Sequence, residues 1–153
     1  MDNIFAQATA AGRAGVSVIR LSGRQAFDIA NNFCKLPAVG RTGLRALRGC
    51  NGALIDHGLV LCFEQGASFT GERVVEFQVH GGLATVAKLL AELSMQEACR
   101  LAEPGEFTRR ALENGQLDLN QVEALSDLID AETEAQRQQA IRVLDGSFGD
   151  AGE

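Results

Sequence analysis

The chain has 153 residues, of which 46% are hydrophobic, enough for one packed domain or for one domain and part of another. Its formal net charge of −6 argues against a primary nucleic-acid-binding role, because phosphate contacts need clustered Lys and Arg. No apolar run is long enough to span a membrane, and the first ten residues lack the pattern of a signal peptide, so we expect a cytoplasmic protein without membrane association.

The first third of the chain predicts two strands followed by a helix. Apolar, partly β-branched runs at Ile4 to Ala8 and Val16 to Leu21 are typical of strands. Ser22 followed by Gln25 matches a capping box, and the apolar spacing after it predicts a helix that runs to about Lys35.

A hairpin is predicted next. Leu36 to Gly49 is expected to be largely irregular, because proline and two glycines punctuate it. Asn51-Gly52 is a strong turn signal, and it predicts a hairpin between a short strand and a longer one over Ala53 to Phe63.

The stretch Ser68 to Gly82 predicts a turn, a strand over Val74 to His80, and a Gly-Gly corner that opens a helix. Alternation along this strand assigns its side chains to two faces: Val75, Phe77 and Val79 on one, and Val74, Glu76, Gln78 and His80 on the other. The second face therefore places a carboxylate in an otherwise apolar strand, which is costly unless that carboxylate is paired.

The next elements follow from spacing and punctuation. Apolar residues at helical spacing from Leu83 to Leu93 predict an amphipathic helix. A short strand is expected around Arg100 to Ala102, and a helix over Glu106 to Asn114 is expected to stop at Gly115.

From Asp118 the pattern becomes that of one long amphipathic helix with an acidic outer face. We interpret it as the first helix of a truncated all-α domain. The predicted fold is therefore α+β, a mixed sheet with packed helices over residues 1–117, followed by the start of a helical domain over residues 118–153.

Cysteines and charges are unevenly placed. Four cysteines without a CxxC pair are interpreted as free thiols in a reducing cytosol, although two disulfides remain an alternative. Basic residues dominate the first 50 positions: Arg13, Arg20, Arg24, Lys35, Arg41, Arg45 and Arg48. A basic N-terminal segment of this kind suits an anionic ligand or RNA, but a solvated surface is the favoured interpretation.

Arg20 and Glu76 are the candidate ligand-binding residues. An ionised carboxylate only accepts hydrogen bonds, and its two oxygens match the adjacent N–H donors of an amino-pyrimidinone edge. Arg20, near the end of a strand, suits a ligand's carbonyl or carboxylate. The plainer alternatives are a surface carboxylate and a strand-end charge.

Several activities are excluded or disfavoured. The sequence has no GxxxxGK[ST], so P-loop hydrolysis of GTP or ATP cannot reside in this piece. It has no GxSxG nucleophile elbow, and with only His57 and His80 a zinc site or a catalytic triad is improbable. We therefore expect no metal site and no catalytic residue.

Four blocks of the sequence carry a family resemblance: ATAAGRAGVSVIRLSG, SFTGERVVEFQVHGG, EPGEFTRRALENGQLDLNQVEALSDLIDAET and the closing LDGSF. In order and approximate spacing they resemble the N-terminal region of the bacterial tRNA-modification GTPases of the MnmE (TrmE) family, over essentially all 153 residues.

That resemblance implies a folate-binding domain similar to that of aminomethyltransferases, which forms a homodimer and binds a tetrahydrofolate derivative such as 5-formyltetrahydrofolate. It implies Arg20, Glu76 and Gln116 as folate-contacting positions. GTP hydrolysis with Mg and K belongs to a G domain absent from this chain, which is interpreted as a fragment. With the FAD-containing partner MnmG (GidA), such proteins build the carboxymethylaminomethyl or aminomethyl group on the wobble uridine of tRNA.

The sequence departs from the family pattern at three positions. Gln116 stands where lysine is usual, so a carboxylate-facing contact there would be weaker, or would come from Arg109 or Arg110. Ala14 replaces a glycine and Cys62 a common tryptophan. The alternative function is a purely structural dimerisation or docking module with a degenerate folate site. An independent folate-dependent aminomethyltransferase is disfavoured, because no positioned general base is evident.

Overall fold

The computed structural model describes residues 2–8, 15–80, 82–118 and 121. In that part of the chain the elements are β1 (Asn3–Gln7), β2 (Ser17–Ser22), α1 (Ala26–Ala30), β3 (Thr42–Arg48), β4 (Leu54–Phe63), β5 (Val74–Val79), α2 (Gly82–Ser94), β6 (Cys99–Leu101) and α3 (Glu106–Glu113).

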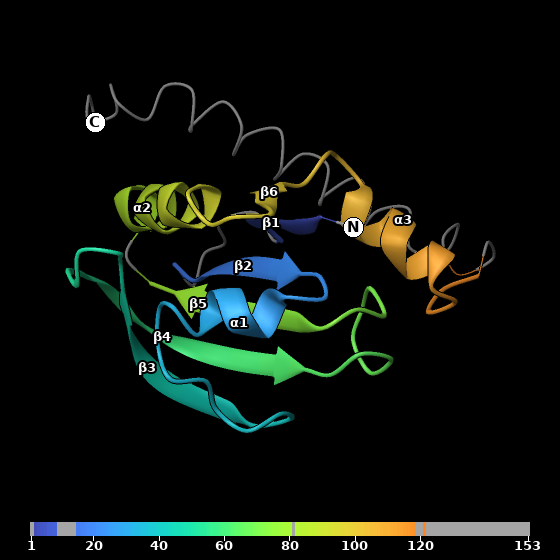
Figure 1. The fold of residues 1–153 in the computed structure, drawn as a ribbon, viewed down its shortest axis with the longest axis horizontal. Coiled ribbons are helices and arrows are strands. Elements are labelled where there is room, and N and C mark those ends of the chain that lie inside the picture. The colour runs from blue at the N-terminus through green and yellow to red at the C-terminus, as the bar shows by residue number, and fades with distance from the viewer. Residues whose placement is uncertain (1, 9–14, 81, 119–120, 122–153) are drawn as a thin grey trace.

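The strands form one six-stranded sheet in the order β3-β4-β5-β2-β1-β6. All neighbouring strands are antiparallel except β1 and β6, which run parallel. Figure 1 shows β3 at one edge of the sheet, and α2 beside β6 and β1 toward the other. The mixed sheet with packed helices confirms the predicted α+β fold.

One face of the sheet, here called the core face, carries Phe5, Ile19, Leu21, Val75, Phe77 and Val79. The helices α1 and α2 pack on these side chains, and all six are at most 1% exposed. The predicted alternation along β5 is therefore confirmed for its apolar residues, because burying one face of a strand fixes which side chains point inward.

The opposite face, here called the site face, carries Arg20 and Glu76. At its β1 end, Ile4 and Ala6 form a second apolar cluster with Ala102 and with Phe107 of α3. Every residue of β1 is consequently buried. Figure 1 shows α3 and the β4–β5 connection at the same end of the sheet, which is where this second layer forms.

The helix predicted after Ser22 is much shorter than expected. The helix α1 covers only Ala26–Ala30, and its N-cap residue Gln25 makes no side-chain capping bond. The Ser22 hydroxyl is instead bound to Thr70 and Glu72, each at 2.7 Å, so the predicted capping box is wrong. A hydroxyl engaged by another segment is not available to cap the helix that follows it.

The segment predicted to be irregular contains the seven-residue edge strand β3. It pairs with β4, with a bulge between Leu47 and Arg48, and this pairing supplies the backbone partners that local sequence does not reveal. The hairpin turn itself is confirmed, because Gly52 has a φ of +82° and the Asn51 side chain accepts from the Ala53 N–H at 3.0 Å.

The predicted long helix and the helical domain over residues 118–153 lie almost entirely outside the described residues, so they stay predictions. Their first turn is partly described. Asp118 N–H donates to Gln121 Oε1 at 2.9 Å, and Gln121 N–H donates to Asp118 Oδ1 at 2.7 Å. These reciprocal bonds are those of a capping box.

All four cysteines are free thiols, which settles the alternative of two disulfides. Burial raises the pKa of Cys34 to about 11 and that of Cys99 to about 12. None of the described helices has both the length and the apolar character that crossing a membrane requires. In the same part of the chain, no three His, Cys, Asp or Glu side chains gather as metal ligands would.

Candidate functional site

Arg20 and Glu76 face each other on the two central strands β2 and β5. They are partners in the β2–β5 register, and Arg20 Nε lies 3.3 Å from Glu76 Oε2. Their side chains are 17% and 18% exposed, so the pair is shielded but still open to a ligand. The carboxylate that was expected to need a partner therefore has one.

Two phenylalanines frame the guanidinium group. Its central carbon lies 4.9 Å from the ring centroid of Phe69 and 5.3 Å from that of Phe107, both within the range of a cation–π contact. Phe107 is fully buried, whereas Phe69 keeps 37% of its surface exposed. The rings hold Arg20 in place, and Phe69 adds an accessible aromatic surface beside the ion pair.

Both members of the pair have hydrogen-bonding atoms that are still available to a ligand. Within the described residues, Glu76 Oε1 and the two terminal nitrogens of Arg20 have no hydrogen-bond partner. Each carboxylate oxygen has two lone pairs, so Oε2 can accept a second bond beside that from Arg20. The site thus offers an acceptor fork and a donor fork next to each other, suited to a planar polar ligand.

The β4–β5 connection, which carries Phe69, is fixed from both sides. Glu72 accepts from the Ser22 hydroxyl at 2.7 Å and from Arg110 Nη1 at 2.9 Å. The Thr70 carbonyl accepts from Asn114 Nδ2 at 2.8 Å. The connection is therefore tied to β2 and to α3, which positions Phe69 over Arg20.

Glu106, the first residue of α3, supports this arrangement through a network of hydrogen bonds. Its carboxylate is 2% exposed and accepts from Arg100 Nη2 at 2.7 Å and Nη1 at 2.9 Å, and from the Glu103 N–H at 2.9 Å. Burial alone would raise its pKa, but these hydrogen bonds and the charges of Arg100 and Arg110 lower the pKa of Glu106 to about 2. The same contact raises the pKa of Arg100.

Gln116 is not brought against the ion pair. It makes no hydrogen bond with Arg20 or Glu76, and its Nε2 lies 3.5 Å from the Gly66 carbonyl oxygen, at the base of the β4–β5 connection. Arg110 cannot replace a cation there, because it is 4% exposed and bound to two carboxylates. The placement brings Arg20 and Glu76 together and leaves Gln116 beside the connection that carries Phe69.

His80 lies apart from the pair. It is exposed, and its backbone N–H donates to Asp56 Oδ2 at 2.8 Å. Gly81, the first glycine of the expected corner, falls outside the described residues. Nothing in the described contacts of His80 links it to Arg20 or Glu76.

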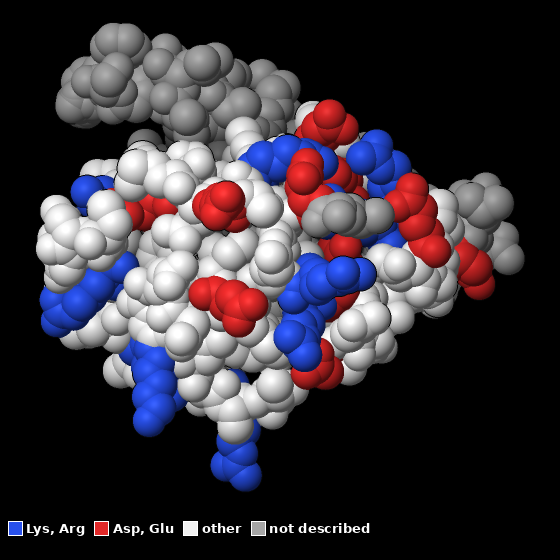
Figure 2. Space-filling view, in the orientation of Figure 1, with Lys and Arg blue, Asp and Glu red and all other residues white. Residues whose placement is uncertain are grey.

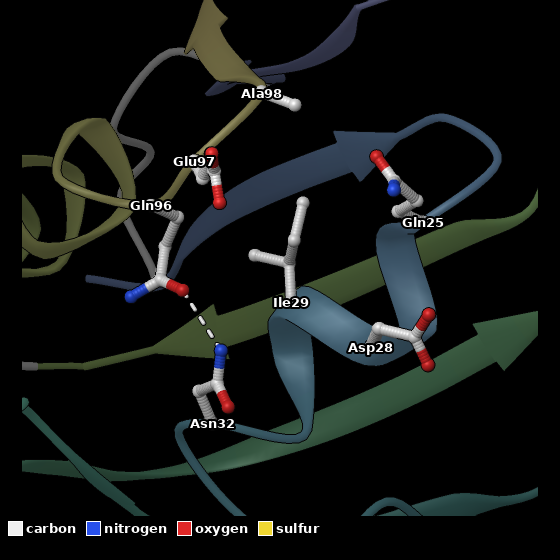
Figure 3. Close-up of a pocket in the computed structure, with 7 residues that line it drawn as sticks. All are labelled: Gln25, Asp28, Ile29, Asn32, Gln96, Glu97 and Ala98. Atoms are coloured by element: carbon white, nitrogen blue, oxygen red, sulfur yellow. Dashed lines mark hydrogen bonds between the residues drawn. The ribbon is translucent and has the colours of Figure 1, made fainter.

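Two surface hollows lie elsewhere. One, of about 470 Å³, lies between α1 and the segment before β6, and its lining is Gln25, Asp28, Ile29, Asn32, Gln96, Glu97 and Ala98. Figure 3 shows that Asn32 and Gln96 bond to each other across it, at 2.8 Å, while Ile29 projects from α1 to one side of this bond. This lining offers no cation and no aromatic ring, so we place the candidate site at the ion pair.

The second hollow, of about 530 Å³, lies beside α3, and its lining is Asp2, Arg100, Glu106, Arg109, Arg110 and Glu113. Most of these charges are already paired: Arg100 with Asp2 and Glu106, and Arg109 with Glu106. The hollow is therefore the open side of the Glu106 network, not a free binding site.

Sequence reasoning missed the residues around the pair. Phe69 and Phe107 come from a connection and a helix far apart along the chain, and no local pattern relates them to Arg20. The spacing of Glu106 and Arg110, four residues apart on a predicted helix, did carry a signal for an ion pair. The tertiary contact of Arg110 with Glu72 did not.

The fold and the site define a small α+β module that presents a paired arginine and glutamate and whose sequence contains no P-loop. Residues 3–116 match the family model described as "GTP-binding protein TrmE N-terminus". The chain therefore belongs to the TrmE N-terminal family, which confirms the resemblance seen in the sequence.

Proteins named "tRNA modification GTPase MnmE" match nearly the whole chain. That of Roseobacter denitrificans is 60% identical over 98% of this chain and 35% of its own length. That of Ruegeria pomeroyi is 57% identical over 100% of this chain and 36% of its own length, and that of Dinoroseobacter shibae is 56% identical over 97% and 35%. The chain thus spans about a third of the length of the curated relatives it matches.

Proposed function

We propose that this chain is the reduced-folate-binding and dimerisation module of a tRNA-modification GTPase. The observation that carries the proposal is the Arg20–Glu76 pair, which keeps free hydrogen-bonding atoms on both members and lies beside an exposed aromatic ring. In this proposal, Glu76 binds the amino-pyrimidinone edge of the pterin and Arg20 binds a carbonyl or carboxylate of the ligand. Gln116 takes a peripheral contact.

The residues present fit such a ligand chemically. A pterin edge has adjacent N–H donors, which match the two oxygens of a carboxylate, and its flat ring suits an aromatic surface such as Phe69. Glu76 Oε1 has no partner among the described residues, so it can accept a donor without breaking the contact to Arg20. The folate would supply a one-carbon unit, and this chain's residues would hold and orient it.

The dimer in this proposal forms through the exposed part of the site face. Leu44 on β3 is 65% exposed. Its neighbours on the same face of β4, Leu59, Leu61 and Phe63, are only partly buried. Leu61 is the register partner of Glu76, so this apolar surface is continuous with the ligand site. An exposed apolar patch is typical of a protein contact.

The parent protein, by the same proposal, hydrolyses GTP with Mg and K in a G domain outside this chain. It acts with MnmG on the wobble uridine of tRNA. Support comes from the relatives, whose name, tRNA modification GTPase MnmE, states both tRNA modification and GTPase activity. The free cysteines are in keeping with action in the cytoplasm, where thiols stay reduced.

A calorimetric titration of 5-formyltetrahydrofolate into the 153-residue chain and its Glu76→Ala variant tests the site. Loss of a charged hydrogen-bonding partner is expected to weaken binding by about 2–3 kcal/mol. Glu97→Ala is the matched control, because Glu97 is exposed and forms no hydrogen bond or ion pair in the described structure. Equal affinity of the parent chain and Glu76→Ala would remove Glu76 from the site.

The alternative is a structural module for dimerisation and docking, whose folate site is degenerate. One observation favours it: Gln116 supplies no cation, and Arg110 is already committed to Glu72 and Glu106. A folded dimer that shows no heat of binding with the reduced folate would support this alternative.

A further inference from the structure

Four basic side chains gather along and just before the edge strand β3: Lys35, Arg41, Arg45 and Arg48. Between Asp28 and Asp56 the sequence contains no Asp or Glu at all. The whole chain carries a net charge of −6, so this segment opposes the charge of the rest. We call these four residues the basic edge.

The basic edge is distinguished by its lack of counter-charges. Elsewhere in the described structure, six of the seven basic residues form ion pairs: Arg20, Arg73, Lys88, Arg100, Arg109 and Arg110. None of the four cations of the basic edge forms one within the described residues. Among the described residues, no carboxylate therefore lies within ion-pair distance of these four cations.

Two of these cations are oriented by main-chain carbonyls instead. Arg45 donates from Nε to the Lys35 carbonyl at 2.7 Å and from Nη1 to the Leu44 carbonyl at 3.0 Å. Arg48 Nη1 donates to the Gly52 carbonyl at 3.1 Å. A carbonyl orients a guanidinium group without cancelling its charge, so these side chains stay available to an anion.

Gly43 provides the space for this arrangement. A Cβ atom at that position would lie 2.6 Å from Arg45 Nη1, closer than real contacts allow. The absence of a side chain thus lets the Arg45 guanidinium group lie against the strand.

The position of β3 exposes the cluster. β3 is the last strand of the sheet, and within the described residues no further strand pairs with its outer edge, where the Arg48 N–H donates to the Phe33 carbonyl at 3.0 Å. Figure 2 shows basic side chains projecting over β3 at the lower left with no acidic ones among them, whereas both signs are interspersed at the upper right. At about 3.3 Å per residue, the segment from Arg41 to the end of β3 at Arg48 extends over roughly 23 Å.

We propose that the basic edge binds the phosphate backbone of an RNA, a proposal that rests on the proposed function in taking tRNA as the substrate of the parent protein. Uncompensated Arg and Lys spaced along an extended strand match a row of phosphates, and arginine binds phosphate with two parallel hydrogen bonds. An acidic protein segment is the less suitable partner, because the centres of protein interfaces are depleted of charged residues.

The test compares two double variants of equal charge change in the 153-residue chain. Arg41→Gln/Arg48→Gln removes two exposed cations of the basic edge. Arg24→Gln/Lys88→Gln removes two exposed cations elsewhere. Binding of a fluorescent, unmodified tRNA transcript is followed by anisotropy over a series of salt concentrations. Calorimetry with 5-formyltetrahydrofolate is run on the same samples.

We expect the edge variant to lose about tenfold in tRNA affinity, and its slope of log K against log salt to fall by about 2, one unit for each phosphate contact removed. The control should retain the parent affinity, and folate binding should be the same in all three proteins. If folate binding fails but the edge effect is present, the proposed folate function fails and the RNA contact stands.

Three outcomes overturn the proposal. The first is that the edge variant binds tRNA as tightly as the control. The second is that the parent chain shows no tRNA binding at low salt. The third is that the edge variant keeps its tRNA affinity and instead loses binding to a polyglutamate peptide, in which case the partner is an acidic protein segment.

Discussion

Glu106 allows the clearest quantitative prediction about stability. Its pKa falls from 4.5 to about 2 in the folded chain, because Arg100, Arg110 and the Glu103 N–H outweigh the effect of burial. At 1.36 kcal/mol per pKa unit, that difference corresponds to roughly 3 kcal/mol of stability at neutral pH. Glu106→Gln keeps the size of the side chain but removes its charge, and it should cost about that amount.

The pH dependence follows from the direction of the shift. A lowered pKa means that the unfolded chain binds the proton more readily, so the stability is present above pH 4.5 and is lost as the pH falls toward 2. Urea unfolding at pH 7 and through this window measures it. Glu97→Gln should leave the free energy of unfolding unchanged. A Glu106→Gln chain as stable as the parent at pH 7, with the same acid dependence, would refute the reasoning.

Three further predictions concern the connection, the thiols and the dimer. Gly71→Ala should destabilise the chain by about 1–3 kcal/mol in urea unfolding, because Gly71 has a φ of +86° and a Cβ there would lie 2.7 Å from Asn114 Cβ. The control is Gly66→Ala, which should cost less, because Gly66 has a similar φ of +85° but open space around it. Equal costs for the two variants would contradict the role of the close contact. At pH 8, iodoacetamide should modify exposed Cys50 first, because burial raises the pKa of the other three thiols; mass spectrometry that finds even labelling would oppose this. Leu44→Asp should shift the proposed dimer toward monomer in analytical ultracentrifugation, and an unchanged dissociation constant would exclude this face.

Strand faces were predictable from the sequence because their signal is local. The alternation of Val75, Phe77 and Val79 with Glu76 has a period of two, and burial of one sheet face enforces it. The glycine that ends α3 was likewise predictable, since Gly115 takes a φ of +76° at the helix terminus.

The errors arose where a distant segment decides the outcome. Ser22 lies 48 residues from Thr70 and 50 from Glu72 along the sequence, yet these two side chains take the hydroxyl that was assigned to a helix cap. β3 is a strand because β4 pairs with it, despite its glycine punctuation. Residue type alone suggested that Glu76 needs a partner, but only the β2–β5 register identifies Arg20.

The same reasoning explains what was missed around the site. Phe69 and Phe107 reach Arg20 because Arg110 and Asn114 tie the β4–β5 connection to α3. These are non-local hydrogen bonds between a connection and a helix, and one sequence carries no direct signal for them. The family resemblance assigned Gln116 to the folate site, but its position in the fold could not be predicted from the sequence. In the structure it lies beside Gly66.

The central claim is that the Arg20–Glu76 pair belongs to a reduced-folate site, and a saturation titration of the unaltered chain with 5-formyltetrahydrofolate tests it most directly. The account predicts a saturable heat of binding with one folate per chain. A folded chain that gives no heat beyond dilution, at folate concentrations well above the protein concentration, would contradict it.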